Sequence, residues 1–199
     1  EGWDFPECAG LPGVFMTAYY ALFHAAKVEP GETLLVHSAA GGVGTALLQL
    51  ARIAGCKAVA VVGASHKIEA CRALGAFAII DRSSQDLWKE AKLLAPAGYD
   101  GVFDANGVST LRQGFDHLAH GGRLVAYGFA DILPRGGKPF LPRMAWNYLR
   151  VPRFSPLEMT TTNRAVIGFN VAFLFHKLEW ATKGMNKIIG WIEEGKIQK

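Results

Sequence analysis

An apolar strand that runs directly into a turn of very small residues constrains this chain more than any other feature. The strand is expected at Thr33–His37, the turn occupies residues 38–44, and a helix is expected to follow over Val43–Ala54. Such a turn leaves the backbone N–H groups at the helix start open, with the positive end of the helix dipole behind them. Bulky side chains at Gly41, Gly42 or Gly44 would block the turn, an approaching diphosphate or helix–strand packing. The order predicts a phosphate cradle.

Compared with the dinucleotide fingerprint G-x-G-x-x-G, the turn has Ala39 in the place of the first glycine. A glycine-rich turn without a ligand is the alternative interpretation. The strand before, the helix after and a second strand that closes a βαβ unit favour a bound dinucleotide. We therefore predict that the diphosphate is contacted by the turn residues Ala40, Gly41, Gly42, Val43 and Gly44.

Strand and helix patterns alternate along most of the chain, with short connections. Strands are expected at Thr33–His37, Lys57–Val62, Phe77–Ile80, Val102–Ala105, Arg123–Tyr127 and Ala165–Phe169. Helices are expected at Leu11–Lys27, Val43–Ala54, His66–Leu74, Gln85–Ala95, Ser109–Leu118 and Trp180–Glu194. This order predicts an α/β fold, a Rossmann-type doubly wound six-stranded parallel sheet with helices on both faces, over residues 1–199.

The alternation is interrupted at residues 129–163, which are rich in proline and arginine. A short helix over Leu141–Val151 would carry Met144, Trp146 and Tyr148. One interpretation is a basic, aromatic element that faces a membrane or a partner. We favour the other, an irregular crossover that covers a sheet edge or forms a subunit contact.

Composition argues against several classes of protein, among them nucleic-acid-binding, zinc-binding and secreted proteins. The net charge of +4 is a mild excess, and no basic stripe with interleaved aromatic residues is present, so no nucleic-acid partner is expected. Three cysteines without C-x-x-C spacing favour reduced thiols over a zinc site. No signal peptide or apolar run of about 18 residues is visible, and a cytoplasmic location is expected. Because the chain starts at Glu1 without a methionine, we expect part of a longer polypeptide.

The end of the second strand, where the adenosine ribose would lie, carries no acid. NAD-specific domains usually place Asp or Glu there to hold the ribose 2′-hydroxyl. This chain instead has Gly63, with space for a 2′-phosphate, followed by Ser65 and Lys67 as donors. The alternative is that Ser65 only caps a helix and Lys67 is a solvated surface residue. The pattern favours NADP(H) over NAD(H).

Three further strand ends belong to the same edge of a parallel sheet, where ligands bind. Arg82 could stack on the adenine or bind the phosphate, although a plain surface role is equally consistent. Asn106, Gly107 and Gly128 follow the fourth and fifth strands, and the two glycines would let the dinucleotide approach the backbone. Asp104 is interpreted as structural.

Several motifs together resemble one known family. They are Leu11-Pro12, Thr17-Ala18-Tyr19, the run from Pro30 to Gly44, Leu74-Gly75-Ala76 and Gly121-Gly122-Arg123-Leu124-Val125. They are similar to the quinone oxidoreductase branch of the medium-chain dehydrogenase/reductases. The segments 154–157, 168–170 and 194–197 resemble the subgroup around the synaptic vesicle membrane protein VAT-1.

The resemblance implies a two-domain enzyme in which this chain is the NADP(H)-binding domain and a GroES-like catalytic domain lies elsewhere. It implies that Thr17, Phe169 and Asn170 approach the nicotinamide half, and that the protein forms a homodimer. It further implies zinc-free hydride transfer to a quinone or enone. Arg82 departs from the tyrosine common in the family, which leaves its contact with the cofactor open.

No acid–base constellation is visible, since the six histidines are scattered in sequence, and no catalytic or metal-binding residue is assigned. Three alternatives stay open. One is a zinc-dependent alcohol dehydrogenase, and another is an NADPH-binding adaptor for a partner or for peripheral membrane contact. The third, an S-adenosylmethionine methyltransferase, predicts an acid where this chain has Gly63.

Overall fold

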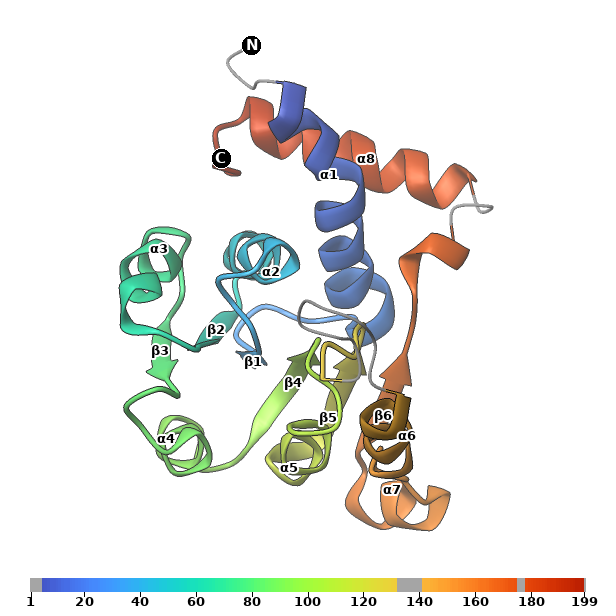
Figure 1. Cartoon of the computed structure of the whole chain (residues 1–199). Helices are drawn as coiled ribbons and strands as arrows, with labels where there is room; N and C mark the ends of the chain where they lie inside the picture. The colour runs from blue at the N-terminus through green and yellow to red at the C-terminus, as the bar shows by residue number, and fades with distance from the viewer. Residues whose placement is uncertain (1–4, 132–140, 175–177, 199) are drawn as a thin grey trace.

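The computed structural model describes residues 5–131, 141–174 and 178–198, which form an α/β fold around one sheet (Figure 1). All strand pairs are parallel. The strands are β1 (Thr33–Val36), β2 (Lys57–Val62), β3 (Ala78–Asp81), β4 (Tyr99–Asp104), β5 (Leu118–Ala126) and β6 (Ala165–Gly168). Their order is β3-β2-β1-β4-β5-β6, the doubly wound arrangement. The predicted fold class is confirmed.

The central strands are apolar because both of their faces are covered. In β1, Leu34 and Val36 belong to one buried cluster and Leu35 belongs to the other. Successive side chains of a strand point to opposite faces, so the two clusters are the cores on the two sides of the sheet. Leu35 is paired with Val59 of β2 and with Val102 of β4, at the centre of the sheet.

Helices cover both faces of the sheet (Figure 1). One face carries α1 (Phe5–Tyr19), the π-helical turn η1 (Tyr20–Ala26), α2 (Gly42–Ile53), α3 (Ile68–Ala73) and α8 (Leu178–Glu193). The other carries α4 (Leu87–Leu94), α5 (Leu111–Asp116) and α7 (Pro156–Thr162). The remaining elements are η2 (Ser65–Lys67), α6 (Leu141–Leu149) and η3 (Val171–Phe173).

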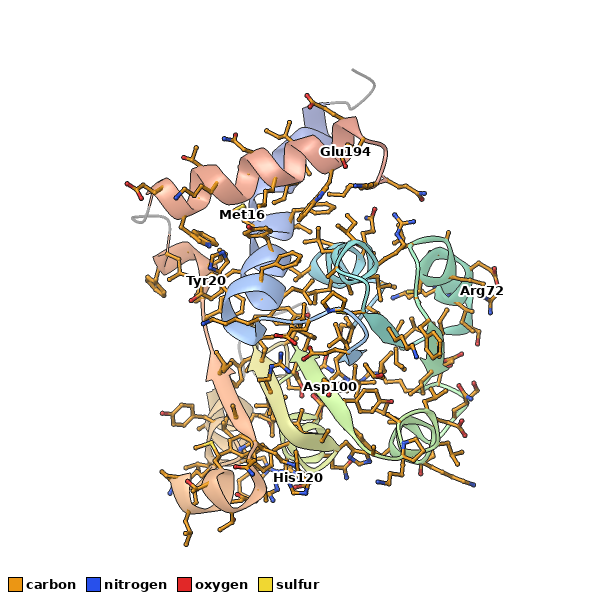
Figure 2. All side chains as sticks on the ribbon, turned by 180° about the vertical axis from the view of Figure 1, so that it is seen from behind. Met16, Tyr20, Arg72, Asp100, His120 and Glu194 are labelled. Carbon is orange, nitrogen blue, oxygen red and sulfur yellow. The ribbon has the colours of Figure 1, made fainter. Side chains whose placement is uncertain are left out.

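The first helix begins at Phe5, earlier than the predicted Leu11, and its last part widens into η1. Lys27 ends η1 in the left-handed conformation with a φ of 50°. Helix α8 crosses α1 closely, and Figure 2 shows Met16 lying between them. A Cβ at Gly184 of α8 would lie 2.9 Å from Met16 Cε and 3.1 Å from the Tyr19 ring, so the two helices are in close contact at this glycine.

The crossover 129–163 is less irregular than predicted. Helix α6 occupies most of the expected range 141–151, whereas α7 was not predicted. Proline suits the first turn of a helix because its missing N–H would have no partner there, and Pro156 starts α7. The basic residues Arg135 and Lys138 of the crossover lie outside the described residues. No helix in the described part of the chain is long and apolar enough to span a membrane.

Candidate functional site

The turn after β1 is held in place from both sides. Ser38 adopts the left-handed conformation with a φ of 53°, and its carbonyl accepts the Gly41 N–H at 2.8 Å. The Ser38 hydroxyl donates to Asn106 Oδ1 at 2.8 Å, which ties the turn to the loop after β4. The Ala39 N–H donates to the carbonyl of Val61 in β2. The turn is therefore positioned by its neighbours at the carboxyl edge of the sheet.

Helix α2 starts with backbone amides that its own geometry leaves free. Gly41 is the N-cap and has no side chain to bond them, while its carbonyl accepts the N–H of Thr45. The N–H groups of Gly42, Val43 and Gly44 precede the first possible intrahelical bond. They point out of the helix at its positive end, at a position exposed at Gly41 and Gly42. This arrangement suits an anion such as a diphosphate.

Two glycines of the turn lie close to other parts of the protein. A Cβ at Gly44 would lie 2.4 Å from the Ser38 carbonyl oxygen and 2.6 Å from Ala39 Cα. A Cβ at Gly42 would lie 3.3 Å from Val14 Cγ2, because α1 packs over the start of α2. Close packing therefore requires glycine at Gly44, whereas at Gly42 the methyl group of Val14 can adjust to a Cβ.

Thr17 lies in α1 and is buried, with 9% of its surface exposed. Its hydroxyl donates to the Gly13 carbonyl at 2.6 Å, within the same helix. That proton is engaged by α1 itself, so any contact of Thr17 with a nicotinamide would use the methyl group or an oxygen lone pair.

At the end of β2 the structure adds an acid that the sequence reasoning missed. Ser65 donates its hydroxyl proton to Asp81 Oδ2 at 2.5 Å. Asp81 ends β3, one strand away from the position where the fingerprint places an acid. Ser65 was predicted to donate to a 2′-phosphate, and this bond changes the role expected of it. The missed signal was the pair Asp81-Arg82 directly after an apolar strand.

Arg82 directly follows β3, and Lys67 ends η2, which comes after β2. The Arg82 Nε lies 3.5 Å from where a Gly63 Cβ would be, so the guanidinium occupies the space that this glycine leaves. Both Arg82 and Lys67 are exposed. The structure thus brings Gly63, Ser65 and Arg82 together around the ends of β2 and β3.

The loops after β4 and β5 pack on each other. Gly107 has a φ of +98°, and a Cβ there would lie 2.8 Å from Phe129 Cδ1. A Cβ at Gly128 would lie 3.0 Å from the Ala105 carbonyl oxygen. Protein atoms thus lie where a Cβ would be at both glycines, so internal packing also requires a small residue there. Their approach by a dinucleotide stays a prediction.

Asp104 is structural, in agreement with its interpretation from the sequence. Its buried carboxylate accepts the N–H groups of Asn106 and Gly107 and the hydroxyl of Thr110. These bonds fix Asn106, the residue that anchors Ser38 of the turn.

Phe169 and Asn170 follow β6 at the same edge of the sheet. The Phe169 ring packs against Tyr20, with 4.7 Å between centroids. The Asn170 side-chain oxygen accepts the Ala172 N–H and caps η3. Phe169 thus lies against η1, and Asn170 follows it at the end of β6. Contact of either residue with a nicotinamide stays a prediction.

His37 directly follows β1 and is fully buried, and neither of its ring nitrogens has a partner among the described residues. Its ring meets Trp88 edge-on at 5.6 Å between centroids. Burial lowers the pKa of His37, and Arg82 lowers it further, while Asp104 opposes the shift. His37 is therefore a packed, neutral side chain.

The lowered pKa of His37 predicts acid sensitivity. Below about pH 6.5 the unfolded chain binds a proton at His37 and the folded chain does not, so the free energy of unfolding should fall as the pH is lowered. The slope contributed by one such group approaches about 1.4 kcal/mol per pH unit. Urea unfolding between pH 7 and 5 should show this slope, and His37→Phe should lose it. Equal slopes for both proteins would contradict the assignment.

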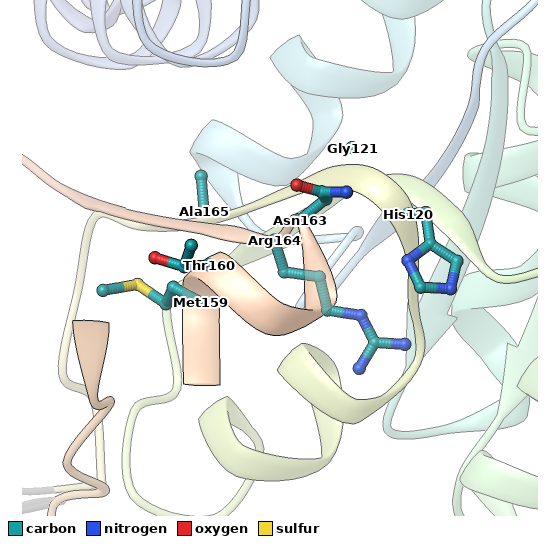
Figure 3. Close-up of a pocket in the computed structure, with 7 residues that line it drawn as sticks. All are labelled: His120, Gly121, Met159, Thr160, Asn163, Arg164 and Ala165. Carbon is teal, nitrogen blue, oxygen red and sulfur yellow. The ribbon is translucent and has the colours of Figure 1, made fainter. Parts of the chain in front are cut away.

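A hollow of about 670 Å³ lies at the other edge of the sheet (Figure 3). It is bordered by His120 in the first half of β5 and by Asn163, Arg164 and Ala165 at the start of β6. Because the strands are parallel, this hollow is at their amino ends, opposite the turn after β1. It is separate from the candidate dinucleotide site.

The fold is shared with known proteins. A family model described as zinc-binding dehydrogenase matches residues 42–184. The chain belongs to this family. Over 200 residues it is 34% identical to the synaptic vesicle membrane protein VAT-1 homolog of Homo sapiens, covering 100% of this chain and 50% of that protein. The predicted resemblance to the quinone oxidoreductase branch and its VAT-1-like subgroup is confirmed.

Two other proteins similar to this chain have names that state an activity. The chain is 30% identical over 196 residues to prostaglandin reductase 1 of Oryctolagus cuniculus, covering 95% of this chain and 50% of that protein. The quinone oxidoreductase of Thermus thermophilus, solved also in complex with NADPH, superposes with a TM-score of 0.75 at 31% identity. That match covers 94% of this chain and 54% of the other. The chain spans about half the length of the curated relatives it matches.

The family description includes zinc, but the residues seen here do not fit a zinc site. No group of three or more His, Cys, Asp or Glu in the described ranges is arranged to hold a metal ion. Cys56 and Cys71 are free thiols, and burial raises the pKa of Cys56 to about 11. His176 lies outside the described residues. No step that involves zinc is assigned to this chain.

Proposed function

We propose that this chain binds NADP(H) and holds its diphosphate on the free amides at the start of α2. The observation that carries the proposal is the N-terminus of α2, where Gly41 leaves the amides of Gly42, Val43 and Gly44 open. Two contacts support it, the hydrogen bond from Ser38 to Asn106 and the close packing of Gly44 on Ala39. They hold the turn in place, so the amides are positioned before a ligand arrives. The relative solved in complex with NADPH has the same fold.

In this proposal the two ends of the cofactor lie over different strands. Lys67 and Arg82 bind the 2′-phosphate beside Gly63. Thr17, Phe169 and Asn170 lie near the nicotinamide half, as the family resemblance implies. The bound cofactor supplies a hydride, and this chain contributes binding and orientation to the reaction.

We further propose that the longer protein transfers this hydride to a quinone or another conjugated carbonyl compound. Two similar proteins, a quinone oxidoreductase and a prostaglandin reductase, support that substrate class by their names. Oxidation of NADPH by the longer protein should depend on added quinone or enone. Cofactor binding without oxidation by any such acceptor would favour the adaptor alternative, and stoichiometric zinc would favour an alcohol dehydrogenase.

Replacing Lys67 tests the 2′-phosphate assignment. Lys67→Ala should raise the dissociation constant for NADPH about tenfold, because a hydrogen bond between charged groups contributes about 1.5–3 kcal/mol. The dissociation constant for NADH should change little. Nicotinamide fluorescence measures both, and Lys187→Ala, which removes an exposed lysine from α8, is the matched control. An equal loss for both cofactors would refute the assignment.

The homodimer and the small-molecule partner remain proposals. Large apolar side chains of α6 and α7 are exposed, among them Trp146, Tyr148, Leu149 and Leu157 at 62–73%. Exposed apolar residues of this size mark a surface for association. We propose that this surface, beside the edge strand β6, joins two copies of the chain. The alternative is peripheral contact with a membrane.

A further inference from the structure

Asp81 is an almost completely buried residue at the end of β3, with 3% of its surface exposed. The proposed function places the adenosine ribose of the cofactor beside it. Its Oδ1 accepts the Ser83 N–H at 2.9 Å and the Ser83 hydroxyl at 2.6 Å. Its Oδ2 accepts the Ser65 hydroxyl at 2.5 Å. The bonds from Ser65 and Ser83 lower the pKa of Asp81 to about 2, so the group is ionised at neutral pH.

The charge on Asp81 decides which way the Ser65 hydroxyl points. An ionised carboxylate has no proton to give, so Ser65 must be the donor in this bond. A hydroxyl has a single proton, and what remains for a ligand is a pair of acceptor sites on Oγ. Ser65 is exposed, so those acceptor sites are available to a ligand.

We propose that Asp81 makes Ser65 a hydrogen-bond acceptor at the adenosine ribose and thereby limits the preference for NADPH over NADH. This inference rests on the proposed function. Ser65 accepts from a ribose hydroxyl and gives no proton to the 2′-phosphate. The phosphate is left to Arg82 and Lys67, and the carboxylate of Asp81 weakens their attraction for it. Asp81 is a positioning residue, since it acts on the cofactor through Ser65.

The substitution Asp81→Asn reverses this arrangement in a defined way. An asparagine has one acceptor oxygen, and the two donors of Ser83 hold that oxygen on their side. The amide NH₂ then faces Ser65 and donates to its Oγ. The Ser65 proton is released and can be donated to a 2′-phosphate.

The test measures dissociation constants for NADPH and NADH with the 199-residue chain, by nicotinamide fluorescence. Asp81→Asn should bind NADPH about fivefold or more tightly, whereas NADH binding stays level or weakens. Partial unfolding of the variant cannot produce a gain in affinity that is limited to one cofactor. Ser65→Ala alone should weaken NADH binding about threefold, because the acceptor for the ribose 2′-hydroxyl is lost. NADPH carries a phosphate in place of that hydroxyl, so its binding should be affected less.

The double variant Asp81→Asn with Ser65→Ala separates the hydroxyl from the charge. If the gain passes through Ser65, most of it disappears in the double variant. A gain kept in full would mean that only the negative charge matters and would overturn the proposed role of Ser65. An unchanged ratio of the NADPH and NADH dissociation constants in Asp81→Asn would also overturn it. So would a loss of about tenfold in NADPH affinity in Ser65→Ala. If Asp81→Asn does not fold, the Ser65→Ala result still decides. A wild-type chain that binds neither cofactor would refute the proposed function itself.

Discussion

Gly41→Asp is expected to abolish binding of both NADPH and NADH while the fold is kept. Gly41 is the N-cap of α2, with the extended backbone that N-cap residues adopt (φ −87°, ψ 169°). An aspartate at this position bonds the second and third amides of the helix. It would therefore occupy the amides of Val43 and Gly44 and place a negative charge where the diphosphate is expected. Affinity should fall about 100-fold or more, since the charge-assisted bonds are lost and replaced by repulsion.

The sign of the stability change makes this result specific. An aspartate N-cap is slightly better than glycine, so the melting temperature should stay level or rise. Gly41→Ala is the matched control, because a Cβ there meets only the Ser38 carbonyl oxygen, at 3.2 Å, and brings no charge. It should retain most of the binding. Tight binding of either cofactor by Gly41→Asp would show that the diphosphate is held elsewhere.

Gly44→Ala is expected to cost about 3 kcal/mol in the free energy of unfolding, at the upper end for an overpacked site. Its Cβ would lie 2.4 Å from the Ser38 carbonyl oxygen and 2.6 Å from Ala39 Cα, which are both backbone atoms. No side chain can move aside, so the turn or α2 must shift. Chemical denaturation of the purified chain measures the loss.

Gly42→Ala is the control on the same turn. Its Cβ would lie 3.3 Å from a methyl group of Val14, which can adjust, and alanine favours the helix over glycine. The change in stability should be less than about 1 kcal/mol. A similar cost at both positions would contradict the account of the turn as a close strand–helix contact at Gly44.

Local sequence patterns were sufficient for the topology. The range of β2 was predicted as it occurs, because an apolar run flanked by glycines has one interpretation in a βαβ unit. The starts of β4 and β5 were not. Gly121 and Gly122 precede the predicted strand Arg123–Tyr127, but they lie within β5, where a Cβ at Gly122 would meet the Tyr99 carbonyl oxygen at 2.7 Å. Pairing across the sheet extends both strands, and sequence alone does not reveal that pairing.

The candidate site was predicted in part for the same reason. The turn 38–44 is local, so its residues and its helix could be named. The role of Ser65 depends on Asp81, sixteen residues later and on another strand. The space beside Gly107 is filled by Phe129, which comes from the loop after β5. Contacts of this kind depend on the assembled sheet edge, and they decide what each predicted residue can offer a ligand.

The most direct test of the diphosphate site is a titration of the ¹⁵N-labelled chain with NADPH, followed through its backbone amide resonances. The account predicts that the largest shifts occur at Gly42, Val43 and Gly44, whose N–H groups would bind the diphosphate. Gly121 and Asn163, at the opposite edge of the sheet, should not move. Unshifted amides at the start of α2 in the presence of saturating NADPH, or shifts centred on Gly121 and Asn163, would contradict it.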